Sequence, residues 1–285
     1  MSVSTRSAER ASRWQFAASW PTRVGLAGIV VILVIAFFGP FASPHSPSEI
    51  VGPPFRGVGW ETPLGTDHLG RDVLSRVLWG GRSLIGLAVA ATAAAYLIGI
   101  PIGLVAGYSR SYADPILMRT MDVLLAFPPL LFLLVLVTGT GPGSVALIAG
   151  AALVNLPGTA RIVRAATIEV SVRGYVEAAV ARGERMPSVL GREIVPNITG
   201  PLLADVGVRL TLSILLIAAV TFLGLGPPPP AANWALMINE NRAGITIQPW
   251  VIVVPALLIA ILTIAVNLVA DAVARSRGIS IVEPQ

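Results

Sequence analysis

The 285-residue sequence has no cysteine and no lysine, and its only histidines are His45 and His68. The missing cysteines exclude disulfides and thiolate metal ligands, and two histidines are too few to favour a metal site or a histidine-based catalytic centre. A nucleotide-binding P-loop uses a lysine to reach the phosphates, so this chain is not expected to hydrolyse ATP by itself. We therefore expect the chain to hold no catalytic residue, no metal and no cofactor.

Charged residues are also scarce, at 12% of the chain, whereas hydrophobic residues make up 54% and the mean hydropathy is +0.78. This composition is far too apolar for a soluble domain of this length and is typical of a polytopic membrane protein. The sequence pI of about 10.6 would suggest nucleic-acid binding in a soluble protein, but in a membrane protein cytoplasmic arginine is the expected source. No nucleic-acid motif is present, so we expect a lipid membrane and no nucleic acid as its partner.

Long uncharged runs predict an all-α membrane protein with six transmembrane helices. The polar segment 1–23 precedes the first run, and its length, with the lack of an A-x-A cleavage signal, favours a retained anchor over a signal peptide. The predicted crossings are residues 24–42, 83–107, the two arms of a hairpin within 123–160 that is broken at 139–144, 202–225 and 250–270.

Polar stretches separate these runs. Residues 43–82 predict an extracytoplasmic segment, with a Pro-rich first part and a short amphipathic helix over 68–81 that lies at the membrane surface. Residues 83–272 are expected to form a five-helix core that includes a re-entrant or surface segment at 233–248. Residues 273–285 form a polar tail.

Arginine is distributed unevenly between the two sides of this topology. Fourteen arginines fall on the side that holds both termini and the loop at about 164–200, five fall on the other side, and Arg209 lies in a crossing. Because basic residues concentrate on the cytoplasmic side of membrane proteins, both termini are predicted to be cytoplasmic. The predicted location is the plasma or inner membrane, crossed several times.

The loop at about 164–200 carries a charged segment between long apolar runs. We expect a helix over 164–181 that Gly183 ends, and a second helix that Pro187 opens and that runs to Pro196. One face of the second helix is apolar, which suits docking into a groove of a partner, and an ordinary basic loop is the alternative. The residues of this face are Met186, Val189, Leu190 and Ile194.

Glu177-Ala178-Ala179, Gly183 and Pro196 stand at the spacing of the EAA loop of ABC importer permeases, which this segment resembles. In that family the loop carries the coupling helix that the ATPase subunit receives. Glu193 replaces a residue that is often hydrophobic, and Pro187 is not part of the usual pattern. The resemblance implies an ATPase-coupling role for Tyr175, Glu177, Ala178, Ala179, Gly183, Met186, Leu190, Pro196 and Asn197.

Residues 62–84, TPLGTDHLGRDVLSRVLWGGRSL, resemble the LGTDxLGRDxxSR signature of the C-type permeases of dipeptide, oligopeptide and nickel importers. We expect Asp67 to cap a helix that begins near residue 68, and Asp72 to pair with Arg76, which favours a structural or docking role. A metal-ligand role for His68 is the weaker alternative, because a lone imidazole makes a poor site. The matching residues are Gly65, Thr66, Asp67, Leu69, Gly70, Arg71, Asp72 and Arg76.

Further matches extend the resemblance over about 62–271, including the FLGLG run at 222–226. One departure is Ile217, because the family often has a glutamate there. The resemblance implies the type I ABC importer permease fold and the role of a transmembrane permease subunit in an ATP-driven importer of di- or oligopeptides. It also implies three kinds of partner. They are a second, homologous permease in a heterodimer, two cytoplasmic ATPase subunits or a fused one that bind ATP and Mg, and an extracytoplasmic substrate-binding protein.

Four charged residues lie in or near the predicted crossings, namely Asp122, Asp205, Arg209 and Asp271. A self-contained secondary transporter or channel that uses them is the alternative function. Asp205 and Arg209, four residues apart near the cytoplasmic end of the fifth crossing, are predicted to pair with each other. Asp122 and Asp271 lie at helix ends, within reach of interfacial water or of Arg119 and Arg275.

Overall fold

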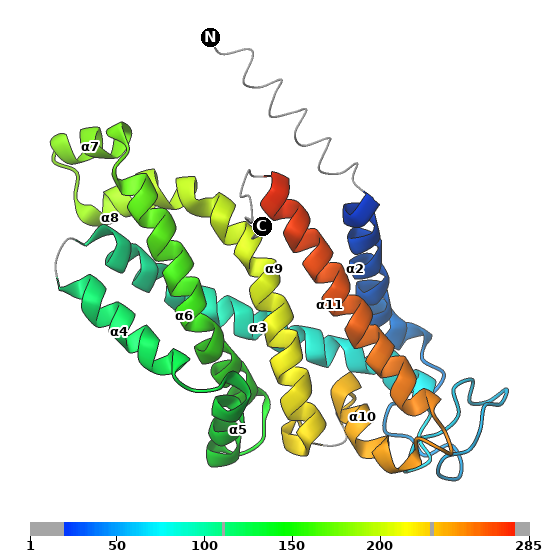
Figure 1. Ribbon diagram of the computed structural model, residues 1–285. Coiled ribbons are helices and arrows are strands. Elements are labelled where there is room, and N and C mark those ends of the chain that lie inside the picture. Colours follow the sequence, from blue (N-terminus) through cyan, green and yellow to red (C-terminus); the bar gives the residue numbers. More distant parts are fainter. Residues whose placement is uncertain (1–19, 110–111, 229–230, 277–285) are drawn as a thin grey trace, which may run out of the picture.

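The computed structural model describes residues 20–109, 112–228 and 231–276 (Figure 1). The helices are α2 Trp20–Phe38, α3 Val73–Tyr108, α4 Ala113–Leu125, α5 Pro129–Thr140, α6 Ser144–Ser171, α7 Gly174–Ala181, α8 Met186–Val189, α9 Val195–Val220, α10 Trp234–Asn241 and α11 Trp250–Ser276. Between these helices, short 3₁₀ segments lie at Gly39–Ala42 and Arg242–Gly244. π-Helical turns lie at Leu190–Ile194 and Thr221–Leu225. The described ranges contain isolated β-bridges but no strand, which confirms the predicted all-α fold.

Five stretches are long and apolar enough to cross a membrane, namely Trp20–Ala42, Val73–Tyr108, Ser144–Ser171, Met186–Leu225 and Trp250–Ser276. α4 and α5 meet the same test only as a pair, because the chain bends by 84° between them. Pro128 and Pro129 lie at this bend, and neither supplies the amide that would continue α4. When the bent pair is counted as one span, the described chain has the six predicted crossings.

α3 is one helix of 36 residues, and this corrects the prediction of a separate amphipathic helix over 68–81. Its N-terminus is capped by Asp72, whose carboxylate accepts a hydrogen bond from the Ser75 amide at 3.0 Å. Gly80 and Gly81 do not interrupt α3 because Trp234 of α10 fills the space beside them. The first turns of α3 are thus buried by protein and are not laid on a membrane surface.

Glycine lets α3 cross closely behind α6 and α9 (Figure 1). Gly99, Gly103 and Gly107 of α3, each four residues from the next, meet Thr159, Val163 and Thr167 of α6. Small residues at this spacing allow transmembrane backbones to approach, which compensates for the lack of a hydrophobic driving force between helices in lipid. Gly28 of α2 and Gly207 of α9 make similar contacts with α11.

Replacement of Gly103 tests this packing against a matched glycine on the same helix. A Cβ at Gly103 would overlap Val163 and the carbonyl of Ala160, whereas a Cβ at Gly86 would meet nothing within 4 Å. We expect Gly103→Val to destabilise the fold by about 1–3 kcal/mol and Gly86→Val to stay within about 0.5 kcal/mol of wild type. Thermal unfolding in detergent measures both variants, and equal melting temperatures would contradict the close contact.

Candidate functional site

The first candidate site is the segment 172–197, which lies at one end of the molecule beside the ends of α3 and α6 (Figure 1). α6 ends at Ser171 and α7 begins at Gly174, so the single helix expected over 164–181 is in fact two helices. Arg173 between them has an extended backbone, with φ −82° and ψ 141°. The weak helix propensity of Gly174 favours a break at this point, which re-aims the chain before the EAA residues.

Gly183 has φ +80°, the left-handed conformation that its predicted capping role requires. Its amide donates to the Val180 carbonyl at 2.9 Å, and the Glu184 amide donates to the Ala179 carbonyl at 3.2 Å. These two bonds form the Schellman motif that closes a helix. The prediction that Gly183 ends the first helix and turns the chain is therefore confirmed.

The second helix differs from its prediction at its far end. Pro187 lies in the first turn of α8, as expected, but the helix does not stop at Pro196. A π-helical turn, Leu190–Ile194, joins it to α9, in which Pro196 takes a position in the first turn. The π-helical turn lies directly before Pro196, whose missing amide cannot continue a regular α-helical ladder. The docking helix and the fifth crossing are thus one continuous body.

The EAA residues divide into a packed set and an exposed set. Ala179 is fully buried, with Val189 and Ile194 in the same apolar cluster, whereas Glu177 and Ala178 are exposed. Met186, expected on the apolar face, is 38% exposed. A hollow of about 570 Å³ lies between α7, α8 and the end of α3, and Tyr108, Glu177 and Met186 are among its lining residues.

Within this segment Tyr175 is also exposed, as are Pro196 and Asn197, while Leu190 is partly buried. The Asn197 amide group donates to the Glu193 carbonyl at 2.7 Å. Glu184 accepts hydrogen bonds from Arg182 and Ser188, and the bond from Arg182 is the main cause of a lowered pKa for this carboxyl. The two hydrogen bonds therefore favour the ionised form of the Glu184 carboxyl.

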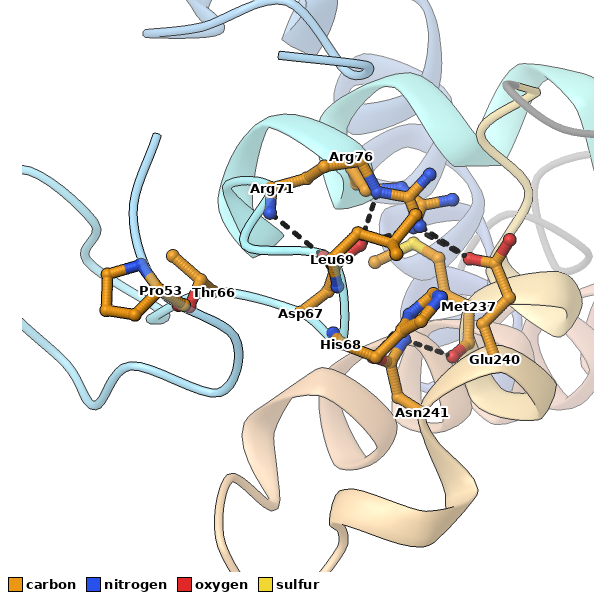
Figure 2. Close-up of polar contacts among 10 residues, drawn as sticks. All are labelled: Pro53, Thr66, Asp67, His68, Leu69, Arg71, Arg76, Met237, Glu240 and Asn241. Carbon is orange, nitrogen blue, oxygen red and sulfur yellow. Dashed lines mark hydrogen bonds and ion pairs between the residues drawn. The ribbon is translucent and has the colours of Figure 1, made fainter. Parts of the chain in front are cut away.

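The second candidate site is an ion cluster where the segment before α3 meets α10 (Figure 2). Arg76 Nη1 lies 2.6 Å from Asp67 Oδ2 and 2.7 Å from Glu240 Oε2. Arg71 contacts the same two carboxylates at 2.7 and 3.0 Å. Asp67 and Arg76 are completely buried, and Glu240 is only 12% exposed. Two guanidinium groups and two carboxylates thus join residues 67–76 to α10 across more than 160 positions of sequence.

Two predictions about these residues were wrong. Asp67 does not cap a helix; instead, its Oδ1 accepts hydrogen bonds from the Leu69 and Arg71 amides, both at 2.9 Å. Asp72 does not pair with Arg76, because it caps α3 and Arg76 turns to Asp67 and Glu240. Burial raises the pKa of the Asp67 carboxyl, but the Arg71 amide and the two guanidinium groups outweigh burial and leave that pKa below its usual value.

The other signature residues shape the backbone around this cluster. Gly65 and Gly70 have φ +72° and +81°, and the Gly70 backbone lies against the Gly52 carbonyl, where a side chain has no room. The Thr66 hydroxyl donates to the Pro53 carbonyl at 2.6 Å, and the Leu69 side chain is 49% exposed. The signature therefore builds a folded segment before α3, and this supports its predicted structural role.

Asp67, His68 and Glu240 also bring potential metal-ligand atoms within 4.8 Å of one another. Both carboxylates already contact two guanidinium groups, whose positive charges oppose a cation at the same place. The His68 amide donates to Asn241 Oδ1 at 2.9 Å, which holds this residue against α10. The arrangement thus suits a structural ion cluster better than a metal centre.

Three of the four intramembrane charges, Asp122, Asp205 and Arg209, have partners within the chain. Arg209 Nε donates to Asp205 at 3.1 and 3.2 Å, so the predicted pair is confirmed. Asp122 pairs with Arg161 of α6, and the expected approach to Arg119 does not occur. Asp271 is exposed near the end of α11, and Ile217 is fully buried in the core.

A family model and several individual relatives match this chain. The family model described as "Binding-protein-dependent transport system inner membrane component" matches residues 99–277, more than half of the chain. The chain belongs to this family of permeases.

Individual relatives and solved structures are also similar to this chain. The chain is 35% identical to the di/tripeptide transport system permease protein DppC of Pseudomonas aeruginosa, over 90% of this chain and 88% of the relative. It is 34% identical to the glutathione transport system permease protein GsiD of Pectobacterium atrosepticum, over 86% and 83%. A chain of the MetNI methionine ABC transporter superimposes with a TM-score of 0.54 at 18% identity, covering 70% of the permease and 96% of that chain. This likeness confirms the ABC importer permease fold.

Sequence reasoning missed several residues that complete these sites in the permease. Glu240 closes the ion cluster, Tyr96 donates to Asp205 at 2.7 Å, and Arg164 binds Asp114 through two nitrogens at 2.6 and 2.7 Å. None of these contacts has a local sequence signal, because the partners are 50 to 164 positions apart. An unpaired charge in an apolar stretch is the only hint that the sequence offers.

Arg76 and Arg56 provide a matched test of the cluster. Arg76→Gln leaves Asp67 and Glu240 short of a buried counter-charge, and we expect a loss of about 3–5 kcal/mol in stability. Arg56 pairs with Glu61 in an exposed bridge, so Arg56→Gln is expected to cost less than about 1 kcal/mol. Adding Glu240→Gln to Arg76→Gln should recover part of the loss. If thermal unfolding in detergent ranks the two single variants equally, the cluster does not hold the segment before α3 against α10.

Proposed function

We propose that the permease is a membrane subunit of an ATP-driven importer that takes up di- or oligopeptides. The observation that carries this proposal is the geometry of segment 172–197. It exposes Glu177 and Ala178 on a short helix, turns at a left-handed Gly183 and continues directly into α9. The names of the relatives, which include a di/tripeptide and a glutathione permease, support peptides as the substrate class.

ATP hydrolysis is assigned to partner subunits, either two ATPases or one fused protein, which also bind Mg. The hollow beside Glu177 and Met186 is the surface that an ATPase would fill, since its lining includes residues of both short helices. Force applied there passes into α9 without an intervening loop, because α8, the π-helical turn and α9 are consecutive. The coupling is therefore a rigid-body push on one side of the transport path.

A second, homologous permease and an extracytoplasmic binding protein complete the proposed assembly. The transport path runs between the two permeases, and the binding protein delivers the peptide on the side of the ion cluster. In Figure 1 the segment 172–197 lies at the same end as the start of α2 and the end of α11, whereas α10 lies at the other end. Together with the arginine distribution, this supports cytoplasmic termini and a cytoplasmic coupling segment in the inner membrane.

The secondary-transporter alternative receives little support from the geometry. Asp205 is paired with Arg209, and Asp122 with Arg161. A proton or ion relay needs carboxylates that change partner along a path, whereas these carboxylates are held by arginines of the same chain. A docked helical segment at 172–197 would also have no task in such a transporter.

Two substitutions test the coupling segment. Gly183→Val places a β-branched residue at φ +80° and opens the turn, and Glu177→Arg reverses an exposed charge at the proposed ATPase surface. We expect both variants to insert normally, to abolish uptake and to lower transport-stimulated ATP hydrolysis in the assembled importer, with Gly183→Val releasing more of the ATPase. Gly191→Ala is the control, because Gly191 has no left-handed backbone and no neighbour within 4 Å. Full uptake by both variants would remove this segment from the mechanism.

The missing lysine provides a separate test. The purified permease alone is expected to hydrolyse no ATP above background, because it lacks the P-loop that binds the phosphates. A phosphate-release assay on permease freed of its ATPase partners measures this. Turnover that copurifies with the permease chain alone would overturn the assignment of ATP hydrolysis to partner subunits.

A further inference from the structure

α9 carries a charged pair that the proposed coupling does not use. Asp205 accepts hydrogen bonds from Arg209 Nε and, at 2.7 Å, from the Tyr96 hydroxyl of α3. Gly158 of α6 lies against the Arg209 guanidinium, because a Cβ at residue 158 would overlap it. Three helices thus meet at Arg209. Asp205 and Tyr96 hold its inner side, and Gly158 supplies the space for its terminal nitrogens.

This site lies near the middle of α6. Gly158 is close to the midpoint of α6, Ser144–Ser171, so about 20 Å of helix separates it from either end. Arg161, three residues further along α6, is half exposed and pairs with Asp122, so the site lies within one helical turn of a charged and exposed pair.

The terminal nitrogens of Arg209 are available. Of the three guanidinium nitrogens of Arg209, only Nε donates hydrogen bonds to a residue that the structure describes. Nη1 and Nη2 contact no acceptor in the described part of the chain. Neither terminal nitrogen is buried, and the Arg209 side chain is 18% exposed. The free edge of a guanidinium presents two parallel N–H donors, the geometry that binds a carboxylate through both oxygens.

α9 has an uncovered face beside Arg209. α9 is backed by α3 and flanked by α6 and α11 (Figure 1), while Val208, Leu212 and Leu215 remain 39–49% exposed on its remaining side. Arg209 lies next to Val208 and three residues before Leu212, so it stands at the edge of this strip. In the proposed importer the second permease and the path lie on this side.

A guanidinium does not face hydrocarbon without a large cost, so its free donors must meet water or an acceptor. A fixed carboxylate from the second permease would leave excess negative charge, since Asp205 already neutralises Arg209. A zwitterionic peptide in transit brings its own positive charge and binds only transiently. We propose that Arg209 recognises the C-terminal carboxylate of a peptide in the path. This inference rests on the proposed peptide uptake and assigns one subsite to it.

The test uses the complete importer in liposomes, with the binding protein loaded with one of two labelled dipeptides. One dipeptide has a free C-terminal carboxylate and the other a C-terminal amide. Arg209→Gln removes the donors, and Gly158→Ala displaces the guanidinium without changing a charge or disturbing a rigid neighbour. Gly86→Ala is the control, because nothing lies within 4 Å of that position. Melting temperature and subunit content are measured for each complex, and Arg209→Gln is repeated with Asp205→Asn in case a stranded carboxylate impairs folding.

We expect Arg209→Gln, alone or with Asp205→Asn, to lower uptake of the free-acid dipeptide roughly ten- to a hundredfold and to leave uptake of the amide nearly unchanged. Gly158→Ala should shift the same ratio in the same direction, while Gly86→Ala should not. Equal loss for both dipeptides would overturn the inference and leave the pair a structural one. A dependence on anionic lipid instead of on the dipeptide carboxylate would overturn it in favour of a headgroup site. If the wild-type importer takes up neither dipeptide, the proposed peptide function fails, and the inference falls with it.

Discussion

The bilayer core offers no water to a polar group, and this constraint accounts for most of the permease's architecture. Backbone hydrogen bonds are made within long helices, and hydroxyl groups in the crossings donate to the carbonyl one turn back, as Thr92 does to Ala88 and Thr211 to Gly207. The pairing of Asp205 with Arg209 follows the same rule, because either charge alone would be stranded in low dielectric.

The same constraint explains how the helices associate. Lipid is as apolar as leucine, so close backbone approach replaces hydrophobic burial as the source of stability. The glycines of α3 provide this approach to α6 and let a 36-residue helix pass behind the bundle. α3 thereby connects the ion cluster at its first turns to the hollow near Tyr108 at its end. In the proposed importer a push on the coupling segment and a change near the binding protein act on one rigid element.

The two ends of the molecule use charge in opposite ways. At the end that holds α10, the buried residues Asp67, Arg71 and Arg76 form ion pairs with one another or with Glu240, which fixes α10 to the start of α3. At the other end Glu177 is exposed on α7. The chain turns after this helix at Gly183, whose positive φ few residues other than glycine adopt readily. Buried charges that pair within the chain suit a fixed scaffold, while an exposed charge beside a defined turn suits contact with another subunit.

The sequence by itself determined the features that depend on composition or on near neighbours. The membrane class follows from hydropathy, the Gly183 turn from the special freedom of glycine, and the Asp205–Arg209 pair from a spacing of four residues on one helix. The tertiary structure alone decided that Asp67 and Arg76 meet Glu240 and that Arg161, 39 positions away, binds Asp122. A charge with two partners in reach takes the one that packing brings to it, and local spacing carries no information about that partner.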